Sequence, residues 1–467
     1  MAKEFIVAIE IGSSKLTGIA GKNNPDGSIT VLATASEDST SYIRKGVVYN
    51  IDKTSQGLNN IITKLKNTLQ TEIMQVYVGI GGQSIRSVKN VVIKDLPLDA
   101  IVSQEMVNEL MDANRNMSYP EYEIQDAITE EYKVDAQYQT DPVGIQAMRL
   151  EGNFLNVLWR RTFYRNLNKS FDNAGIAIAE TYLAPLVMAE NVLTEAEKRA
   201  GCVLVDLGAD TTTVSVYYRD KLRNIAVIPL GSNNVTKDLE SLQIDEREAE
   251  ALKIKYGSAF TDTKDVDPNK LLPIDGTRTI TCKQLIEIVE ARMLEIIENT
   301  KRLIPNEYID KLLGGIVLTG GGSNMNNIER AFKEITHIEK VRVAKFVTTN
   351  INTKDSDVTL AHDGTMNSIL SILAKGNMNC AGKELNEAVN EEEDVVNVPV
   401  NNGPTAEELA RKAEEERLRR EAEEAERKRK EEEKKKEEEN NNKKGWKKIV
   451  KKGKSFFTTI FEPDVND

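Results

Sequence analysis

The chain has 467 residues, 40% of them hydrophobic, and a formal net charge of −12 at neutral pH. This length leaves room for two or more domains, and the acidic balance argues against general nucleic-acid binding. Three widely spaced cysteines form no disulfide framework, which suits a reducing cytoplasm. With only two histidines, a Ser-His-Asp mechanism or a multi-histidine metal site is not expected. Neither a signal peptide nor a membrane-spanning stretch is expected.

Two segments share one pattern, in which an apolar strand is followed by an acid-x-Gly turn and a second strand. They are VAIEIGSSKLTG (7–18) and VLVDLGADTTTV (203–214), at an offset of 196 residues. The next strands, ITVL (29–32) and IAVI (225–228), are expected to keep this offset without a gap. Any two β-hairpins look alike to some extent, but the third strand favours a duplicated α/β domain.

Each acid-x-Gly turn is suited to bind an anion, because glycine lets backbone N–H groups approach closely and nearby hydroxyls add donors. Glu10 and Asp206 end the two strands, and we expect these candidate catalytic acids to hold a hydrated Mg²⁺ between the loops. The candidate nucleotide-binding residues of the two turns are Gly12, Ser13, Ser14, Lys15, Gly208, Asp210, Thr211 and Thr212.

A third element, GGIVLTGGGSNMNNIERAFKEI (314–335), has the pattern of a buried strand, three glycines and a helix. An open backbone at the N-terminus of a helix is a natural site for a ribose or a phosphate. Each loop alone also fits an ordinary tight turn, but together they predict a nucleotide in a cleft between two lobes. The candidate residues of this third loop are Gly320, Gly321, Gly322 and Ser323.

The composition changes after residue 380. Residues 381–406 are predicted to be a flexible linker. Residues 407–439 contain 15 Glu and 12 Lys or Arg, without an apolar stripe to bury, which predicts a solvated helix or a disordered spacer. Residues 443–462 place bulky apolar side chains at helical spacing beside lysines.

This last pattern is typical of a helix that lies in the plane of an anionic membrane surface. A surface helix packed on the globular body is the alternative interpretation. The candidate membrane-contacting residues are Trp446, Lys447, Lys448, Ile449, Val450, Lys451, Lys452, Phe456, Phe457, Ile460 and Phe461.

The three glycine-containing loops resemble those of the actin, sugar-kinase and heat-shock-chaperone ATPase superfamily. Further segments are similar to the bacterial cell-division protein FtsA, and the resemblance covers residues 4–380. These segments are VYVGIGGQSI (76–85), DPVGI (141–145), YLAPLVMAENVLTEAEKRAGCVLVDLGADTT (182–212), VIPLGSNNVTKDL (227–239) and AEALKIKYGSA (249–259).

The resemblance implies a two-lobed actin-like fold with four subdomains, which binds ATP and Mg²⁺. Residues 1–84 and 166–197 would form the first subdomain, and 85–165 an FtsA-specific insert. Residues 198–235 and 300–380 would form the second actin-like subdomain, and 236–299 a small subdomain. The membrane-associated part would comprise a linker and spacer (381–442) and an amphipathic helix (443–462).

The resemblance also places Gly231, Glu250 and Lys253 at the nucleotide, although an exposed helix pair is the plainer interpretation of the last two. Two departures from the family pattern matter. Asp210 stands where the second phosphate loop is usually glycine-rich, and Ala184-Pro185 replace a Gln or Glu that positions the attacking water. Hydrolysis should therefore be slow, with ATP acting as a structural or switching ligand, and the sequence leaves open whether ATP is turned over.

By resemblance, the chain is expected to tether filaments of FtsZ to the cytoplasmic face of the inner membrane at the division site and to help assemble the septum. The FtsZ C-terminal peptide would meet Arg278 and Arg292, whose forks suit carboxylates, although both also fit plain surface charges. Actin-like filaments are implied too, and docking of other division proteins is left open. The alternative function is a soluble small-molecule kinase of the same superfamily, although no carboxylate base can be nominated for it.

Overall fold

The computed structural model describes residues 4–385, except 263, 265, 266, 268, 275–277 and 355–358. The charged spacer and the candidate membrane-contacting residues of 443–462 therefore lie outside the described residues. Within the described ranges, no helix is long and apolar enough to cross a membrane.

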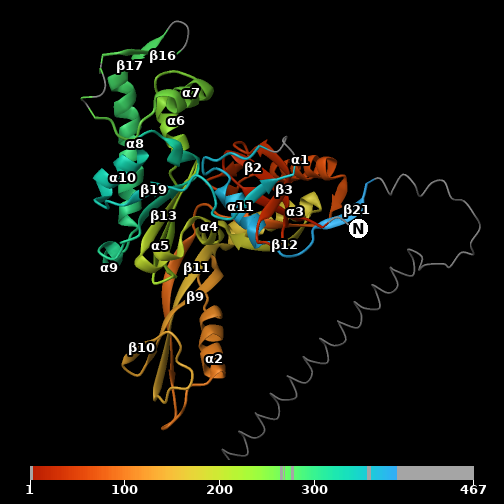
Figure 1. Cartoon of the computed structure of the whole chain (residues 1–467), viewed down its shortest axis with the longest axis vertical. Coiled ribbons are helices and arrows are strands. Elements are labelled where there is room, and N and C mark those ends of the chain that lie inside the picture. The colour runs from red at the N-terminus through yellow and green to blue at the C-terminus, as the bar shows by residue number, and fades with distance from the viewer. Residues whose placement is uncertain are drawn as a thin grey trace, which may run out of the picture. The chain divides into compact units, whose positions relative to one another are not determined.

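The first lobe is built on a six-stranded sheet in the order β12-β7-β1-β2-β3-β20 (Figure 1). The strands β1, β2 and β3 form an antiparallel meander, and β7 and β12 run parallel to β1. Helix α1 packs against Gly18 and α11 against Gly21, so the two helices contact β2 through different residues. The elements are β1 (Ile6–Ile11), β2 (Lys15–Asn23), β3 (Ile29–Asp38), β4 (Ile43–Arg44), β5 (Val47–Val48), α1 (Ile51–Leu69), β6 (Thr71–Ile73), β7 (Gln75–Ile80), α3 (Arg161–Ala174), β12 (Ala177–Leu183), α4 (Ala184–Val192), β20 (Ile351–Thr353) and α11 (Asn367–Lys375).

The second lobe repeats this topology. Strands β13, β14 and β15 form an antiparallel meander, and β18 and β19 run parallel to β13, as β7 and β12 do to β1. The duplication predicted from the acid-x-Gly repeat is therefore present in the fold. The elements are α5 (Glu195–Ala200), β13 (Cys202–Leu207), β14 (Thr212–Tyr218), β15 (Lys221–Ile228), α6 (Ser232–Glu240), α7 (Glu246–Tyr256), β16 (Leu271–Pro273), β17 (Thr279–Thr281), α8 (Cys282–Arg302), α9 (Asn306–Ile309), β18 (Gly315–Thr319), η1 (Gly321–Asn324), α10 (Ile328–Thr336) and β19 (Val341–Val343).

The third strand of the repeat does not keep the predicted offset. Thr17 pairs with Ser36 in the first lobe, and its counterpart Thr213 pairs with Val227 in the second. The first two strands match at an offset of 196 residues, whereas Ser36 and Val227 differ by 191. The hairpin of the second lobe is therefore five residues shorter, which a comparison of short apolar runs could not detect.

The insert is a sheet of β8, β9, β10 and β11 with one helix, α2, and it projects from the body in Figure 1. The Ser103 side chain caps the N-terminus of α2, where it accepts a hydrogen bond from the Met106 backbone N–H. One residue pair, Arg86 with Ala226, joins β8 to β15, so the insert and the second lobe share a nine-stranded sheet. The elements are β8 (Arg86–Asp95), α2 (Gln104–Arg115), β9 (Tyr122–Val134), β10 (Gln137–Gln139) and β11 (Arg149–Arg160).

The chain returns to the first lobe near its described end. Strand β20 pairs with β3, and α11 packs on β1, β2 and α4. The expectation that residues 300–380 all belong to the second lobe is therefore wrong for β20 and α11. Strand β21 (Ala381–Glu384) pairs with β6, so the predicted linker does not begin at residue 381 either.

Candidate functional site

A cleft of about 550 Å³ lies between the two lobes, and both acid-x-Gly turns line it. Glu10 comes from β1 and Asp206 from β13, at the same position of the repeated hairpin: Glu10 lies opposite Thr17, and Asp206 lies opposite Thr213. Because the topology is duplicated, the two acids enter one cleft from two lobes.

The cleft makes both acids hard to ionise. Burial raises the pKa of Glu10 to about 7; a hydrogen bond from Ser368 opposes this rise, the negative charge of Asp206 adds to it, and Lys15 opposes it. Burial also raises the pKa of Asp206 to about 6. A cation between the two acids would relieve both effects.

The two carboxylates suit an Mg²⁺ ion that phosphate oxygens would also bind. Among the described residues, no group of three His, Cys, Asp or Glu side chains could hold a metal ion by itself. Mg²⁺ does not need such a group, because it keeps several waters and binds one or two carboxylates together with phosphate oxygens. Glu10 and Asp206 provide those carboxylates beside loops that present backbone groups.

Glycine is required sterically in each loop. A Cβ on Gly12 would lie 2.5 Å from the Lys15 carbonyl oxygen, and one on Gly208 would lie 2.9 Å from the Thr211 carbonyl oxygen. Gly320 has φ of 81°, and a Cβ there would lie 2.3 Å from Oδ1 of Asp206. The third loop therefore approaches the second-lobe acid closely.

Most of the candidate nucleotide-binding residues line the cleft, and four do not. The lining residues are Glu10, Gly12, Ser13, Ser14, Lys15, Asp206, Gly208, Thr211, Glu250, Lys253, Gly320, Gly321 and Gly322. Of the remaining four, Thr212 is buried and donates its hydroxyl to the Leu230 carbonyl oxygen, 2.9 Å away. Buried Ser323 donates its own to the Gly320 carbonyl oxygen at 2.7 Å.

The other two residues support the second phosphate loop from behind. A Cβ on Gly231 would lie 2.4 Å from the Ala209 carbonyl oxygen, so Gly231 packs directly on that loop. The Asp210 carboxylate accepts hydrogen bonds from the Lys45 backbone N–H at 3.2 Å and from Nδ2 of Asn233 at 3.0 Å. Asp210 therefore links the second lobe to a loop of the first.

The helix predicted directly after the third glycine loop begins later. Residues Gly321–Asn324 form a single 3₁₀ turn, and α10 begins at Ile328. The N-cap of α10, Asn327, has a left-handed backbone and does not line the cleft. The glycine turn therefore meets the cleft without the N-terminus of an α-helix behind it.

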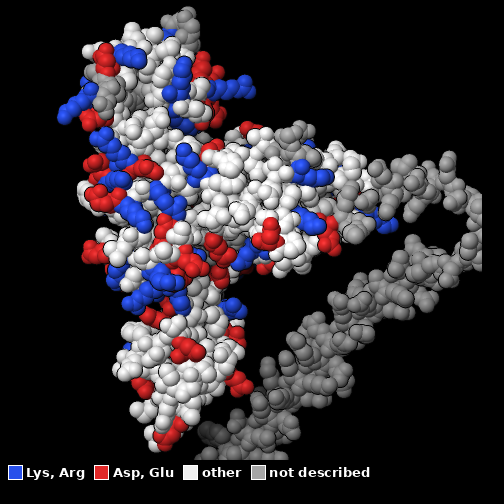
Figure 2. Space-filling model, viewed as in Figure 1, with Lys and Arg blue, Asp and Glu red and all other residues white. Residues whose placement is uncertain are grey.

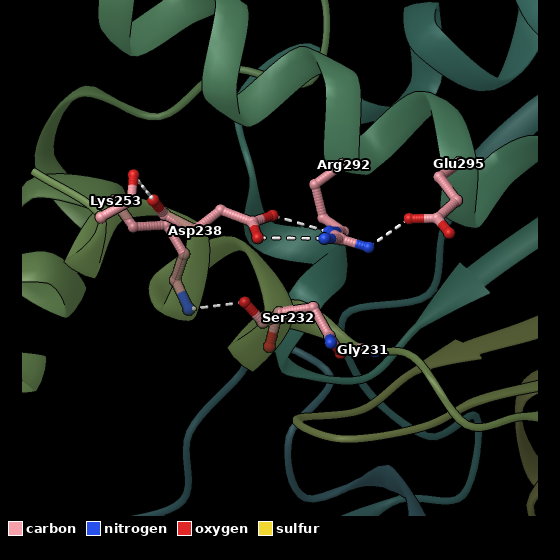
Figure 3. Close-up of polar contacts among 8 residues, drawn as sticks. Gly231, Ser232, Asp238, Lys253, Arg292 and Glu295 are labelled. Carbon is pink, nitrogen blue, oxygen red and sulfur yellow. Dashed lines mark hydrogen bonds and ion pairs between the residues drawn. The ribbon is translucent and has the colours of Figure 1, made fainter.

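Glu250 and Lys253 line the cleft as a mutual ion pair. Nζ of Lys253 lies 2.6 Å from Oε2 of Glu250. It also donates to the Ser232 carbonyl oxygen at 3.2 Å (Figure 3). Both side chains also bond to the Thr236 hydroxyl. Since Lys253 is only 7% exposed, it locks α7 against α6 beside the cleft.

The two candidate peptide-binding arginines already have partners within the chain. Nε and Nη2 of Arg292 donate to the two carboxylate oxygens of Asp238 at 2.6 and 3.0 Å, and Glu295 forms a further ion pair (Figure 3). Nη1 of Arg278 donates to the Gln243 carbonyl oxygen at 2.7 Å. Arg292 therefore joins α8 to α6 as the structure stands.

Several residues of the cleft were missed by the sequence reasoning. Gly46 and Gly82 meet backbone to backbone, since a Cβ on Gly46 would lie 2.5 Å from the Cα of Gly82. The GIGG motif was a sequence signal for Gly82, whereas Gly46 had none. Asn233, Ile254 and Ser368 also line the cleft and had no sequence signal.

The duplicated topology around one cleft defines an actin-like protein of mixed α/β architecture. A solved structure of the PilM-PilN type IV pilus biogenesis complex matches it with a TM-score of 0.54, at 15% identity over 79% of this chain and 97% of that one. At this identity, the likeness concerns the fold alone.

Sequence comparison identifies the family. The model for cell division protein FtsA matches residues 203–366, and the model for the SHS2 domain inserted in FtsA matches residues 82–158. Cell division protein FtsA of Porphyromonas gingivalis is 30% identical over 74% of both chains, and that of Neisseria meningitidis is 32% identical over 70% of this chain and 80% of its own. The chain belongs to the FtsA family of cell division proteins.

Proposed function

We propose that this chain binds ATP with Mg²⁺ in the cleft and tethers FtsZ filaments to the cytoplasmic face of the inner membrane at the division site, where it helps assemble the septum. The observation that carries the nucleotide part is the pair of acids, Glu10 and Asp206. Two hard-to-ionise carboxylates beside two glycine turns are costly, and Mg²⁺ with a polyphosphate offsets that cost.

Different residues of the cleft would bind the metal, the phosphates and the nucleoside. Glu10 and Asp206 would hold the hydrated Mg²⁺, and backbone N–H groups of the turns at Gly12 and Gly208 would donate to the phosphates. When bound, the Mg²⁺ neutralises phosphate charge. Gly320–Gly322 and exposed Ile254 flank the nucleoside side of the cleft.

ATP acts mainly as a structural or switching ligand. Ala184 and Pro185 line the cleft at the start of α4. Neither side chain can donate or accept a hydrogen bond, so neither can orient an attacking water. Slow ATP hydrolysis follows. ATP would therefore stay bound between the two lobes for longer than it does in a fast ATPase.

The adaptor part rests on family membership and on the C-terminal pattern. The lysine-rich apolar segment 443–462 provides the membrane contact, and the small subdomain around α8 receives the acidic-apolar FtsZ peptide. Because Asp238 already occupies the fork of Arg292 and Glu248 lies 3.8 Å from Nη2 of Arg278, a peptide carboxylate must compete with one of these two acids. Liposome binding by the full chain, and its loss on truncation after Asn442, tests the anchor.

Titration calorimetry tests the nucleotide site. We expect Asp206→Asn to raise the Kd for ATP at least tenfold when Mg²⁺ is present, and the difference from the native chain to vanish in EDTA. Asp220→Asn is the matched control, since this acid lies on the β14–β15 turn and pairs with Arg199 at 3.3 Å. An unchanged Kd in Asp206→Asn would refute the assignment.

A further inference from the structure

The chain passes from one lobe to the other at two places that lie side by side. The first is the short connection between α4 and α5, formed by Leu193 and Thr194, and the second is the stretch 344–350 between β19 and β20. The backbone N–H and the hydroxyl of Thr348 both donate to the Asn191 carbonyl oxygen, at 2.7 and 2.9 Å. Because these bonds tie one crossing to the other, the two crossings form a single joint.

Arg342 of β19 binds both sides of the first crossing. Its Nη2 donates to the carbonyl oxygen of Val192, which ends α4 in the first lobe, at 2.9 Å. Nε and the same Nη2 donate to the two carboxylate oxygens of Glu197, on α5 in the second lobe, each at 2.7 Å. A cation at the C-terminal end of a helix is favourable, and a two-pronged contact with a carboxylate fixes the guanidinium plane. One side chain therefore spans the connection between the lobes.

The carboxylate that Arg342 binds is also held by the crossing itself. Glu197 is only 6% exposed, and its Oε2 accepts from the backbone N–H and the hydroxyl of Thr194, at 2.9 and 3.0 Å. Figure 2 shows that acidic side chains gather on the surface over α4 and α5, and a cation is favoured in such surroundings. Since Arg342 and Thr194 both donate to one buried carboxylate, the geometry of the crossing is tightly determined.

A second polar link joins the lobes closer to the cleft. Asn367, at the start of α11 in the first lobe, is fully buried. Its Nδ2 donates to the hydroxyl of Thr319, at the end of β18, at 2.9 Å and to the Ala344 carbonyl oxygen at 2.8 Å. Helices α4 and α11 pack against each other, and β18 and β19 are neighbours in the second-lobe sheet (Figure 1). The two links therefore join one pair of helices to one pair of strands.

Helix α4 connects this joint to the cleft. Ala184 and Pro185 line the cleft at the start of α4, whereas Val192 accepts from Arg342 at its end. A helix of nine residues is a stiff rod about 13 Å long. A displacement of α4 at the cleft is therefore passed on to the joint.

We propose that Arg342 and Asn367 are the two fixed points about which the lobes turn when a nucleotide enters or leaves the cleft. This inference rests on the proposed nucleotide binding. With both links intact, the cleft opens by rotation while the joint stays closed. Without Arg342 the end of α4 is released, and the lobes also separate at the joint. Neither side chain lines the cleft, so both are positioning residues that act on the nucleotide through α4 and α11.

Stopped-flow release of a fluorescent ATP analogue from the full chain, with Mg²⁺ present, tests the first link. Arg342→Lys keeps the positive charge beside Glu197 but replaces the fork by a single nitrogen. We expect release to become faster by a factor of about five or more, because changes at a contact act mainly on dissociation. Arg223→Lys is the matched control, since Arg223 forms a buried ion pair with Glu130 of the insert, at 3.3 Å, and does not join the two lobes.

The outcomes separate this inference from the function on which it rests. Binding of the analogue with equal release rates in the native chain and in Arg342→Lys would overturn the inference alone. A native chain that does not bind the analogue would overturn the proposed nucleotide binding and the inference together. Faster release in Arg223→Lys as well would show that loss of any buried ion pair has this effect, and would also overturn the inference.

Distances between the lobes give a readout that a merely structural role would not change. Spin labels on Lys53→Cys of α1 and Arg247→Cys of α7, both exposed, report the separation by double electron–electron resonance, with the half-buried Cys282 replaced by serine. We expect one narrow distribution that shifts when ATP binds, and broader distributions in both states after Arg342→Lys or Asn367→Ser. No shift with ATP, or equal widths with and without these substitutions, would overturn the proposal.

Discussion

Replacing Glu10 by glutamine should stabilise the nucleotide-free protein while weakening its ligand site. A pKa raised from the ordinary 4.5 to about 7 means that the folded state disfavours the carboxylate by about 3 kcal/mol above pH 7. Glutamine has the same shape without the charge, but its half-buried amide has a desolvation cost of its own, so the expected net gain is about 2 kcal/mol.

The dependence on pH provides the decisive comparison. As the pH falls from 8 towards 5, Glu10 takes up a proton in the folded state first, which stabilises the native chain but not the variant. The gain in the free energy of unfolding from Glu10→Gln should therefore be largest above pH 7 and should decrease as the pH falls towards 4.5. Urea unfolding in EDTA at pH 8 and pH 5.5 measures it, with Glu334→Gln on the exposed face of α10 as the control. Equal stability at pH 8, or a gain that is the same at both pH values, would refute the reasoning.

Three further predictions concern polar contacts of the second lobe. Asp210→Ala removes the acceptor of the Lys45 backbone N–H, so we expect several-fold faster release of a fluorescent ATP analogue and faster hydrogen exchange at Lys45; unchanged exchange would contradict this. Burial raises the pKa of Glu197, but the hydrogen bonds and charge of the Arg342 fork, together with hydrogen bonds from Thr194, outweigh burial and lower that pKa to about 2. Glu197→Gln should therefore cost about 2–3 kcal/mol at pH 7, with a loss that shrinks as the pH falls below 4.5; urea unfolding at pH 7 and 3 checks it. Arg292→Ala should weaken binding of the FtsZ peptide, measured by fluorescence anisotropy, and an unaltered affinity would remove Arg292 from that site.

The part of the site that lies within a single hairpin was predictable. The equivalence of Glu10 and Asp206 follows from a repeated strand-turn-strand pattern, because local sequence determines where each strand ends. The steric need for Gly12 and Gly208 follows from the same turns. A shared cleft required only that the two hairpins be duplicates, and the topology of the two lobes agrees.

Contacts between distant segments were beyond such reasoning. Nothing near Asp210 shows that its carboxylate accepts from Lys45, since the two residues meet only after the lobes assemble. The hydrogen bond between Arg292 of α8 and Asp238 of α6 joins two residues that are 54 positions apart in the sequence. The return of α11 to the first lobe depends on long-range packing against β1 and α4, which hydrophobic periodicity does not encode.

Co-sedimentation of FtsZ filaments with anionic liposomes tests the central claim most directly. With Mg²⁺ and ATP present, the full chain should carry FtsZ into the liposome pellet, and the chain truncated after Asn442 should leave it in the supernatant. Equal amounts of pelleted FtsZ with the full chain, the truncated chain and no added chain would contradict the account.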